Sequence, residues 1–169
     1  TEIASVTRHP ERCIGMHFFN PPVLMKLVEV IPGVRSTVEA AQQGLSLAAR
    51  MGKTPVEARD TPGFIVNRAI RPFYLEALRL LGEGVADPAT IDRIVRVGGG
   101  FPMGPFELID LVGLDVNFAV SQTVYESFFQ PARFRPHIIQ HQMVRAGLLG
   151  RKSGRGLDRK STRLNSSHT

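Results

Sequence analysis

The sequence predicts an α/β remnant followed by an all-α helical domain. Within residues 1–60, short runs rich in Val and Ile lie on either side of one helical pattern. After Asp60 the strand signals stop, and apolar residues recur at helical spacing as far as Gly147. Hydrophobic residues make up 43% and charged residues 21% of the chain, which is the balance of a soluble globular protein.

The first sixty residues are expected to hold three strands and one helix. The apolar run 13–19 is ended by Asn20-Pro21-Pro22, and the run 26–31 is ended by Pro32-Gly33, so both indicate strands. Residues 36–51 carry apolar side chains at helical spacing, with Ser36 or Thr37 as N-cap and Gly52 as the stop. Residues 53–58 form a third strand candidate, so the helix is expected to cross over between parallel strands.

The remaining residues are expected to be helical. Thr61-Pro62 indicates an N-cap followed by proline at the first helical position, which opens a long apolar stripe ending at Leu81. Asp87-Pro88 opens a second helix, with Ile91, Ile94 and Val95 directed inward and glycines 98–100 at its end. Further helices are expected at 105–111, 116–129 and 136–146. We therefore divide the chain into domains 1–60 and 61–156.

The composition of the sequence changes abruptly near its end. From Asp158 the chain is polar and without periodicity, and it resembles the translation of a DNA-sequencing adapter. A genuine disordered tail is the alternative. In either case residues 157–169 are expected to be disordered, and they are left out of the fold prediction.

Charge and cysteine content narrow the possible partners. The net charge is +6, and residues 133–163 carry many Arg and Lys against the single acid Asp158. Such a basic end can bind nucleic acid or the phosphates of a nucleotide or coenzyme A, but no aromatic residues interleave with the cations to stack on bases. No apolar run reaches the ~18 residues of a membrane-spanning helix. We expect neither a nucleic-acid nor a membrane partner and no metal site. The lone Cys13 is expected to be buried and structural, which fits a reducing cytoplasm.

One histidine and one glutamate stand out in the strand predictions. His17 lies where the first strand meets a turn, and Glu29 interrupts a run that otherwise indicates a fully buried strand. A buried carboxylate needs a partner, and His17 on the neighbouring strand is the obvious one. A carboxylate beside an imidazole fixes its tautomer and favours its charged form, which yields a general base. A purely structural hydrogen bond is the alternative.

Four motifs together resemble the 3-hydroxyacyl-CoA dehydrogenase family. They are His-Phe-Phe-Asn-Pro-Pro with Met-Lys-Leu-Val-Glu-Val-Ile, Thr-Pro-Gly-Phe-Ile-Val-Asn-Arg, Gly-Pro-Phe-Glu-Leu-Ile-Asp and Gly-Arg-Lys-Ser-Gly-Arg-Gly. The resemblance extends from Thr1 to about Gly156. It implies that residues 1–60 are the last strands of a Rossmann-type NAD-binding domain, with NAD as cofactor. It also implies that the enzyme oxidises the 3-hydroxyl of an acyl-CoA in fatty acid β-oxidation, and that the helical domain forms a homodimer.

The resemblance also implies roles for single residues. His17 would be the base that takes the hydroxyl proton, and Glu29 would orient it. Asn67 would bind near the reacting oxygen of the substrate. Asn20 and Lys152 would lie beside the cofactor. Without the resemblance, Asn67, Asn20 and Lys152 are compatible with an ordinary helix-start, turn and loop residue respectively.

Parts of the family pattern are missing. The chain has no Gly-x-Gly-x-x-Gly loop, and glycines 98–100 follow a helix without that spacing. We expect a chain truncated at both ends that alone neither binds NAD tightly nor turns over. A non-catalytic helical dimerisation module and a related sugar-acid dehydrogenase are the alternatives. Acyl chain length stays open, since 3-hydroxybutyryl-CoA and phenylacetate-pathway substrates are both compatible.

Overall fold

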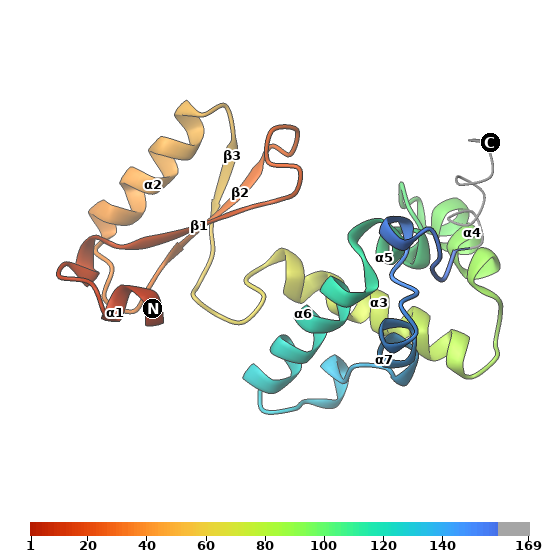
Figure 1. Cartoon of the computed structure of the whole chain (residues 1–169). Coiled ribbons are helices and arrows are strands. Elements are labelled where there is room, and N and C mark those ends of the chain that lie inside the picture. The colour runs from red at the N-terminus through yellow and green to blue at the C-terminus, as the bar shows by residue number, and fades with distance from the viewer. Residues whose placement is uncertain (159–169) are drawn as a thin grey trace. The chain divides into compact units, whose positions relative to one another are not determined.

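The computed structural model describes residues 1–158, which form two compact units. The first spans Thr1–Val66, and the second begins at Asn67. A three-stranded sheet with one long helix makes up the first, and the second is helical (Figure 1). The predicted fold class is therefore confirmed.

The sheet of the first unit has the strand order β1-β2-β3. Strand β2 (Leu27–Pro32) lies in the centre, antiparallel to β1 (Ile14–Phe18) and parallel to β3 (Thr54–Glu57). Helix α2 (Val38–Arg50) connects β2 to β3, as a crossover between parallel strands requires. The Thr37 side chain accepts a hydrogen bond from the Ala40 amide at 3.2 Å and caps this helix.

The side chains on the two faces of β2 have different surroundings. Val28 and Val30 are fully buried and pack with Ala48 of α2, so this face carries the core of the unit. The helix approaches closely, because a Cβ added to Gly44 would lie 2.1 Å from Cδ1 of Ile14. Side chains alternate along a strand, so Glu29 projects from the opposite face.

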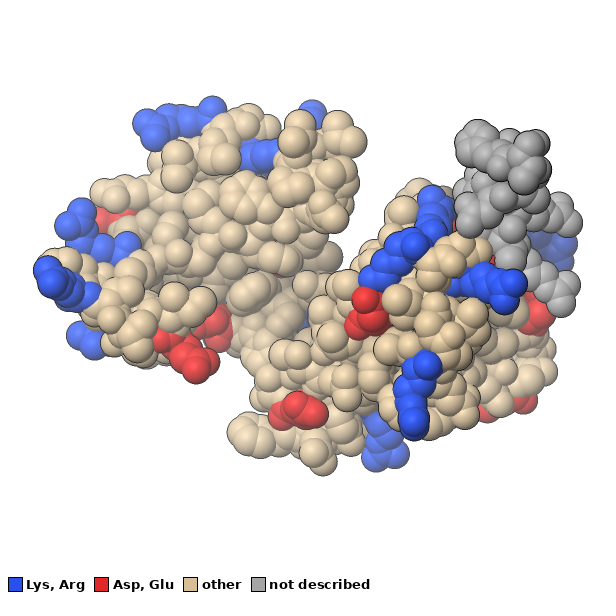
Figure 2. All heavy atoms as spheres, viewed as in Figure 1, with Lys and Arg blue, Asp and Glu red and all other residues tan. Residues whose placement is uncertain are grey.

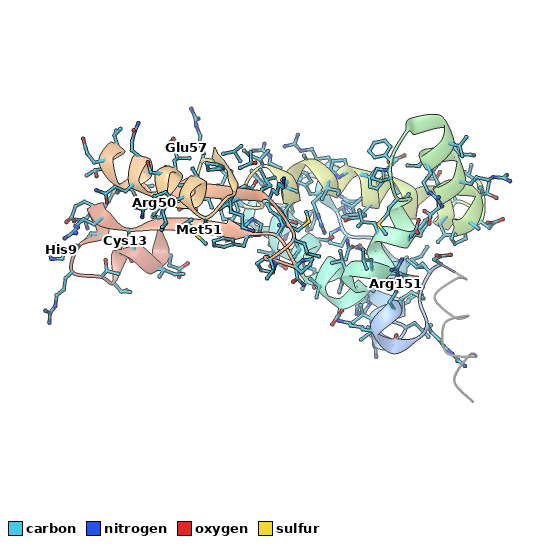
Figure 3. The ribbon with its side chains drawn as sticks, turned by 90° about the horizontal axis from the view of Figure 1, so that it is seen from above. His9, Cys13, Arg50, Met51, Glu57 and Arg151 are labelled. Carbon is cyan, nitrogen blue, oxygen red and sulfur yellow. The ribbon has the colours of Figure 1, made fainter. Side chains whose placement is uncertain are left out.

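Cys13 lies near the amino end of the first unit, after the short helices α1 (Glu2–Ser5) and η1 (Pro10–Arg12). Its Sγ lies 3.3 Å from Oγ1 of Thr7 and donates to the carbonyl of His9 at 3.4 Å (Figure 3). The thiol is half-buried rather than buried as predicted. Both of its hydrogen-bond partners, Thr7 and His9, are exposed residues, so the thiol lies near the surface.

The second unit packs five helices around one apolar core. Tyr74, Leu75 and Leu78 of the longest helix meet Phe106 and Ile109 at its centre. The elements are α3 (Val66–Gly82), α4 (Pro88–Gly99), α5 (Pro105–Val112), α6 (Leu114–Ser127) and α7 (Ile138–Arg145), with the short turns η2 (Ala132–Phe134) and η3 (Arg151–Ser153).

Helix α4 is rotated relative to the prediction. Asp87 caps it and Gly100 ends it in a left-handed conformation, both as expected. Ile91 is buried, but Ile94 is 61% exposed, so its predicted inward position was wrong. The buried neighbour of Ile91 is instead Asp92, whose carboxylate accepts the Phe106 and Glu107 amides at 2.9 Å each. That contact caps α5, because Gly104 at its start has no side chain to do so.

The closing segment of the helical unit is built around Asp110. Its two oxygens accept the amides of Leu157 and Asp158 at 2.9 and 2.7 Å. Gly150 and Gly156 lie so close that an added Cβ would come within 2.6 Å of Asp110. These hydrogen bonds hold Leu157 and Asp158 in place, so the prediction of disorder was wrong for the first two residues of the predicted tail. The rest of that tail, 159–169, lies outside the described residues.

The charged surface of the helical unit is mixed. On the face drawn in Figure 2, its Lys and Arg side chains lie in separate groups with Asp and Glu side chains between them. Within the part of the chain that the structure describes, no helix has the length and apolar character needed to cross a membrane.

Candidate active site

His17 and Glu29 are direct cross-strand neighbours. The antiparallel register of β1 and β2 places His17 opposite Glu29, so both side chains project from the same face of the sheet. His17 Nδ1 and Glu29 Oε2 lie 2.7 Å apart. The imidazole is 30% exposed, whereas the carboxylate is fully buried. The contact predicted from the sequence is therefore present.

The second oxygen of Glu29 has two partners of its own. Oε1 accepts the backbone amides of Ile65 and Val66, each at 2.9 Å. Ile65 directly precedes helix α3, and Val66 is its first residue. The backbone amides in the first turn of a helix have no acceptors within the helix. The buried carboxylate thus accepts three hydrogen bonds, which are what a buried charge requires. It is held from two directions, by a strand partner and by a helix start.

The start of α3 differs from the prediction. Thr61-Pro62 does not begin the helix, because the chain first makes a turn that the Phe64 amide closes on the Thr61 carbonyl at 2.9 Å. Gly63 and Phe64 have φ angles of +75° and +46°, which no helix residue adopts. The helix begins at Val66, where Glu29 supplies the capping acceptor. The capping carboxylate lies 36 residues away from Ile65 in the sequence, so the local pattern could not reveal it.

Two aromatic rings flank the imidazole of His17. The ring of Phe19 lies edge-on at 4.8 Å between centroids, and the ring of Phe64 lies tilted at 5.5 Å. Because an ionised Glu29 can only accept, Nδ1 of His17 must donate, which leaves the lone pair on Nε2. With Glu29 ionised, the contact therefore fixes the tautomer of His17 and leaves the Nε2 lone pair without a hydrogen-bond partner among the described residues.

The other predicted site residues are distributed over both units. Asn20 is an exposed residue in the bend that follows β1, two residues after the end of the strand. Asn67 is the first residue of the second unit and directly follows Val66 in the chain. Lys152 lies in η3 and forms an ion pair with Asp115, which lowers the pKa of that carboxyl group. Of the five predicted site residues, only His17 and Glu29 form a hydrogen bond with each other.

Sequence reasoning missed two features beside these residues. The amides of Ile65 and Val66 are backbone groups, so no residue type signals them. Arg71, on α3, is only 4% exposed, although a charged side chain is ordinarily expected at the surface. Burial lowers the pKa of Arg71 below its ordinary value. The position of Arg71 within the apolar stripe of α3 was the one available signal.

Two models of one protein family match consecutive parts of this chain. The family model for the NAD-binding domain of 3-hydroxyacyl-CoA dehydrogenase matches residues 1–61. The model for the C-terminal domain of the same family matches residues 63–159. The chain is 52% identical to 3-hydroxyadipyl-CoA dehydrogenase of Escherichia coli and 46% identical to a probable 3-hydroxybutyryl-CoA dehydrogenase of Bacillus subtilis.

The relatives are longer than this chain. The alignments cover 93% and 92% of this chain, but only 33% of the E. coli protein and 54% of the B. subtilis protein. The crystal structure of (S)-3-hydroxybutyryl-CoA dehydrogenase from Ralstonia eutropha is similar with a TM-score of 0.90 and 42% identity. That similarity covers 93% of this chain and 55% of the other.

Proposed function

The chain belongs to the 3-hydroxyacyl-CoA dehydrogenase family, and from that premise we propose that it is part of an enzyme that oxidises the 3-hydroxyl group of an acyl-CoA to a ketone. The observation that carries the proposal is the 2.7 Å contact between His17 Nδ1 and the fully buried Glu29. It leaves Nε2 as a proton acceptor of the kind that alcohol oxidation needs.

The proton is transferred to His17. Nε2 takes the proton of the 3-hydroxyl group, while the hydrogen on C3 departs as hydride and the C3–O bond becomes a carbonyl. The imidazolium that forms carries its charge beside Glu29, whose carboxylate stabilises it through Nδ1–H. Asn67 is proposed to donate its side-chain amide to the reacting oxygen. Glu29 is thus a positioning residue, and His17 is the catalytic base.

NAD is proposed as the hydride acceptor, since part of the chain matches an NAD-binding domain. NAD would supply the two-electron oxidation when it is bound. The described residues fit only a part of its site, because none of their strand-to-helix turns has the Gly-x-Gly-x-x-Gly spacing. Asn20 is exposed and suited to a contact with the cofactor. Lys152 would first have to leave Asp115. The isolated chain is therefore expected to be inactive, and detectable oxidation by it would contradict this.

We also propose a substrate class and an oligomeric state. The names of the relatives point to 3-hydroxyadipyl and 3-hydroxybutyryl thioesters, so we propose a short 3-hydroxyacyl-CoA. A homodimer through the helical unit is supported by apolar side chains that its surface exposes, such as Val97 at 81% and Ile94 at 61%. Sedimentation of the chain at several concentrations tests it, and a monomer at all of them would count against the dimer.

Substitution of His17 in the full-length polypeptide tests the proposed chemistry. We expect His17→Gln to lower kcat about 10²–10⁴-fold with unchanged circular dichroism, because general-base assistance is lost. His9→Gln is the matched control, since His9 also contacts a carboxylate, Glu11, at 3.2 Å, but on the surface. Equal activity of the two variants would refute His17 as the base.

A further inference from the structure

A cluster of polar side chains lies in the interior of the helical unit. Arg71 of α3, Asn117 and Ser121 of α6 and Gln140 of α7 are at most 4% exposed. Arg71 Nη1 donates to the Asn117 carbonyl at 3.0 Å and to Ser121 Oγ at 3.1 Å. Gln140 Nε2 donates to Asn117 Oδ1 at 2.7 Å. The cluster connects three helices through neutral acceptors.

Two donor atoms of this cluster make no hydrogen bond to a described residue, and one of them, Nδ2 of Asn117, is a buried unsatisfied atom. Nη2 of Arg71 makes no hydrogen bond within residues 1–158, and no carboxylate there forms an ion pair with this guanidinium. The centroid of the Tyr74 ring lies 4.9 Å from Arg71 Cζ, so this ring faces the guanidinium.

The unsatisfied groups define what would complete the cluster. Buried polar groups in folded proteins are almost always hydrogen-bonded, and buried charges are paired. An ordered water would satisfy Asn117 but leave the charge of Arg71 uncompensated. A carboxylate accepts from both groups and supplies the counter-charge, and a guanidinium fits it with two parallel hydrogen bonds. An anionic oxygen ligand would therefore complete the cluster.

The position of Arg71 relates this ligand to the substrate. Arg71 lies four residues after Asn67 on α3, so both residues are on the same helix face. Arg71 Nε donates to the Asn67 backbone carbonyl at 3.3 Å, which holds the guanidinium beside that residue. A ligand whose oxygen binds at Asn67 can thus extend along one helical turn, about 5.4 Å, to reach the guanidinium.

We propose that Arg71 and Asn117 bind the terminal carboxylate of the acyl group, so that the preferred substrate is the coenzyme A thioester of a 3-hydroxy dicarboxylic acid. The inference rests on the proposed function, in which Asn67 contacts the reacting oxygen. In a six-carbon chain the carboxylate carbon is three bonds beyond the carbon that carries the hydroxyl group. That separation is shorter than one helical turn, so one helix can contact both ends.

Two thioesters of equal length test the proposal in the full-length polypeptide. 3-Hydroxyadipyl-CoA and 3-hydroxyhexanoyl-CoA differ only in a carboxylate or a methyl group at C6. We expect calorimetry to give a dissociation constant about tenfold or more lower for the adipyl compound, because hydrogen bonds to charged groups contribute most. Arg71→Gln should remove that preference, so that the dissociation constants of the two thioesters become equal. Arg79→Gln, a more exposed arginine on the same helix, is the control and should keep the preference.

The possible outcomes distinguish failure of the carboxylate site from failure of the proposed dehydrogenase function. Equal affinity of the unaltered protein for both thioesters overturns the carboxylate site, even if Arg71→Gln fails to fold. Oxidation of both thioesters at equal kcat/KM overturns it while the dehydrogenase function stands. Tighter binding of the adipyl compound without turnover of either supports the site and refutes the proposed chemistry. A preference that survives Arg71→Gln shows that another group reads the carboxylate and overturns the assignment.

Discussion

Exchange of Glu29 for glutamine tests how the buried carboxylate holds the imidazole. Glutamine has the same shape, but it has one accepting oxygen and one donating nitrogen. The oxygen must face the amides of Ile65 and Val66, because a donor there would leave both amides without acceptors. The nitrogen then donates to Nδ1 of His17, which must give up its own proton. We therefore expect Glu29→Gln to move the ring proton to Nε2.

The energetic cost follows from the three hydrogen bonds. Each of these hydrogen bonds loses a charged acceptor or gains a neutral donor, and is thereby weakened by about 1 kcal/mol. The three together are weakened by about 3 kcal/mol. Relief from burying a carboxylate offsets part of this. The net loss in free energy of unfolding is expected to be about 1–3 kcal/mol. With Nε2 protonated the base is lost, so kcat of the full-length polypeptide should fall about 10²–10⁴-fold.

Nitrogen-15 NMR of the histidine rings in this chain measures the tautomer directly, and urea unfolding followed through amide signals of the first unit measures stability. Glu11→Gln is the matched control, since its carboxylate contacts His9 on the surface, and neither quantity should change. A proton that stays on Nδ1 of His17 in Glu29→Gln would refute this account of the site.

Two further predictions concern the helical unit. Burial lowers the pKa of His137, whose neutral Nδ1 accepts the Ile139 amide at 3.3 Å, so the folded state excludes a proton that the unfolded chain binds at its ordinary pKa of about 6.5. The stability of the unit should therefore fall as the pH drops below about 6.5, and His137→Asn, which keeps a capping oxygen, should remove that dependence in thermal unfolding. Gly104→Ala should destabilise by about 1–3 kcal/mol in urea unfolding, because its Cβ would lie 2.3 Å from the fixed Asp92 carboxyl group. Gly98→Ala, with no atom within 4 Å, should instead stabilise the helix by about 0.5–1 kcal/mol, and equal effects of the two exchanges would contradict the packing argument.

Much of the fold could be predicted because its signals are local. Strands β1 and β2 follow from short apolar runs bounded by proline and glycine, and α2 and α4 from caps and stops at both ends. The predicted inward position of Ile94 failed because Asp92 is buried to serve the start of α5. When a polar residue is buried because it caps another helix, the apolar periodicity of its own helix cannot reveal it.

The pairing of His17 with Glu29 could be inferred because a charge within a buried strand needs a partner on its neighbour. The sequence alone determined the family, the order of sheet and helices, and that pair. Only the tertiary structure decided where α3 begins, since the acceptor for its first amides is the Glu29 carboxylate on a strand far away in the sequence. It also decided that Arg71 is buried without a carboxylate partner among the described residues. Hydrogen bonds from a side chain to backbone amides of a distant segment depend on how the chain packs in three dimensions, and no residue type in the sequence marks those amides.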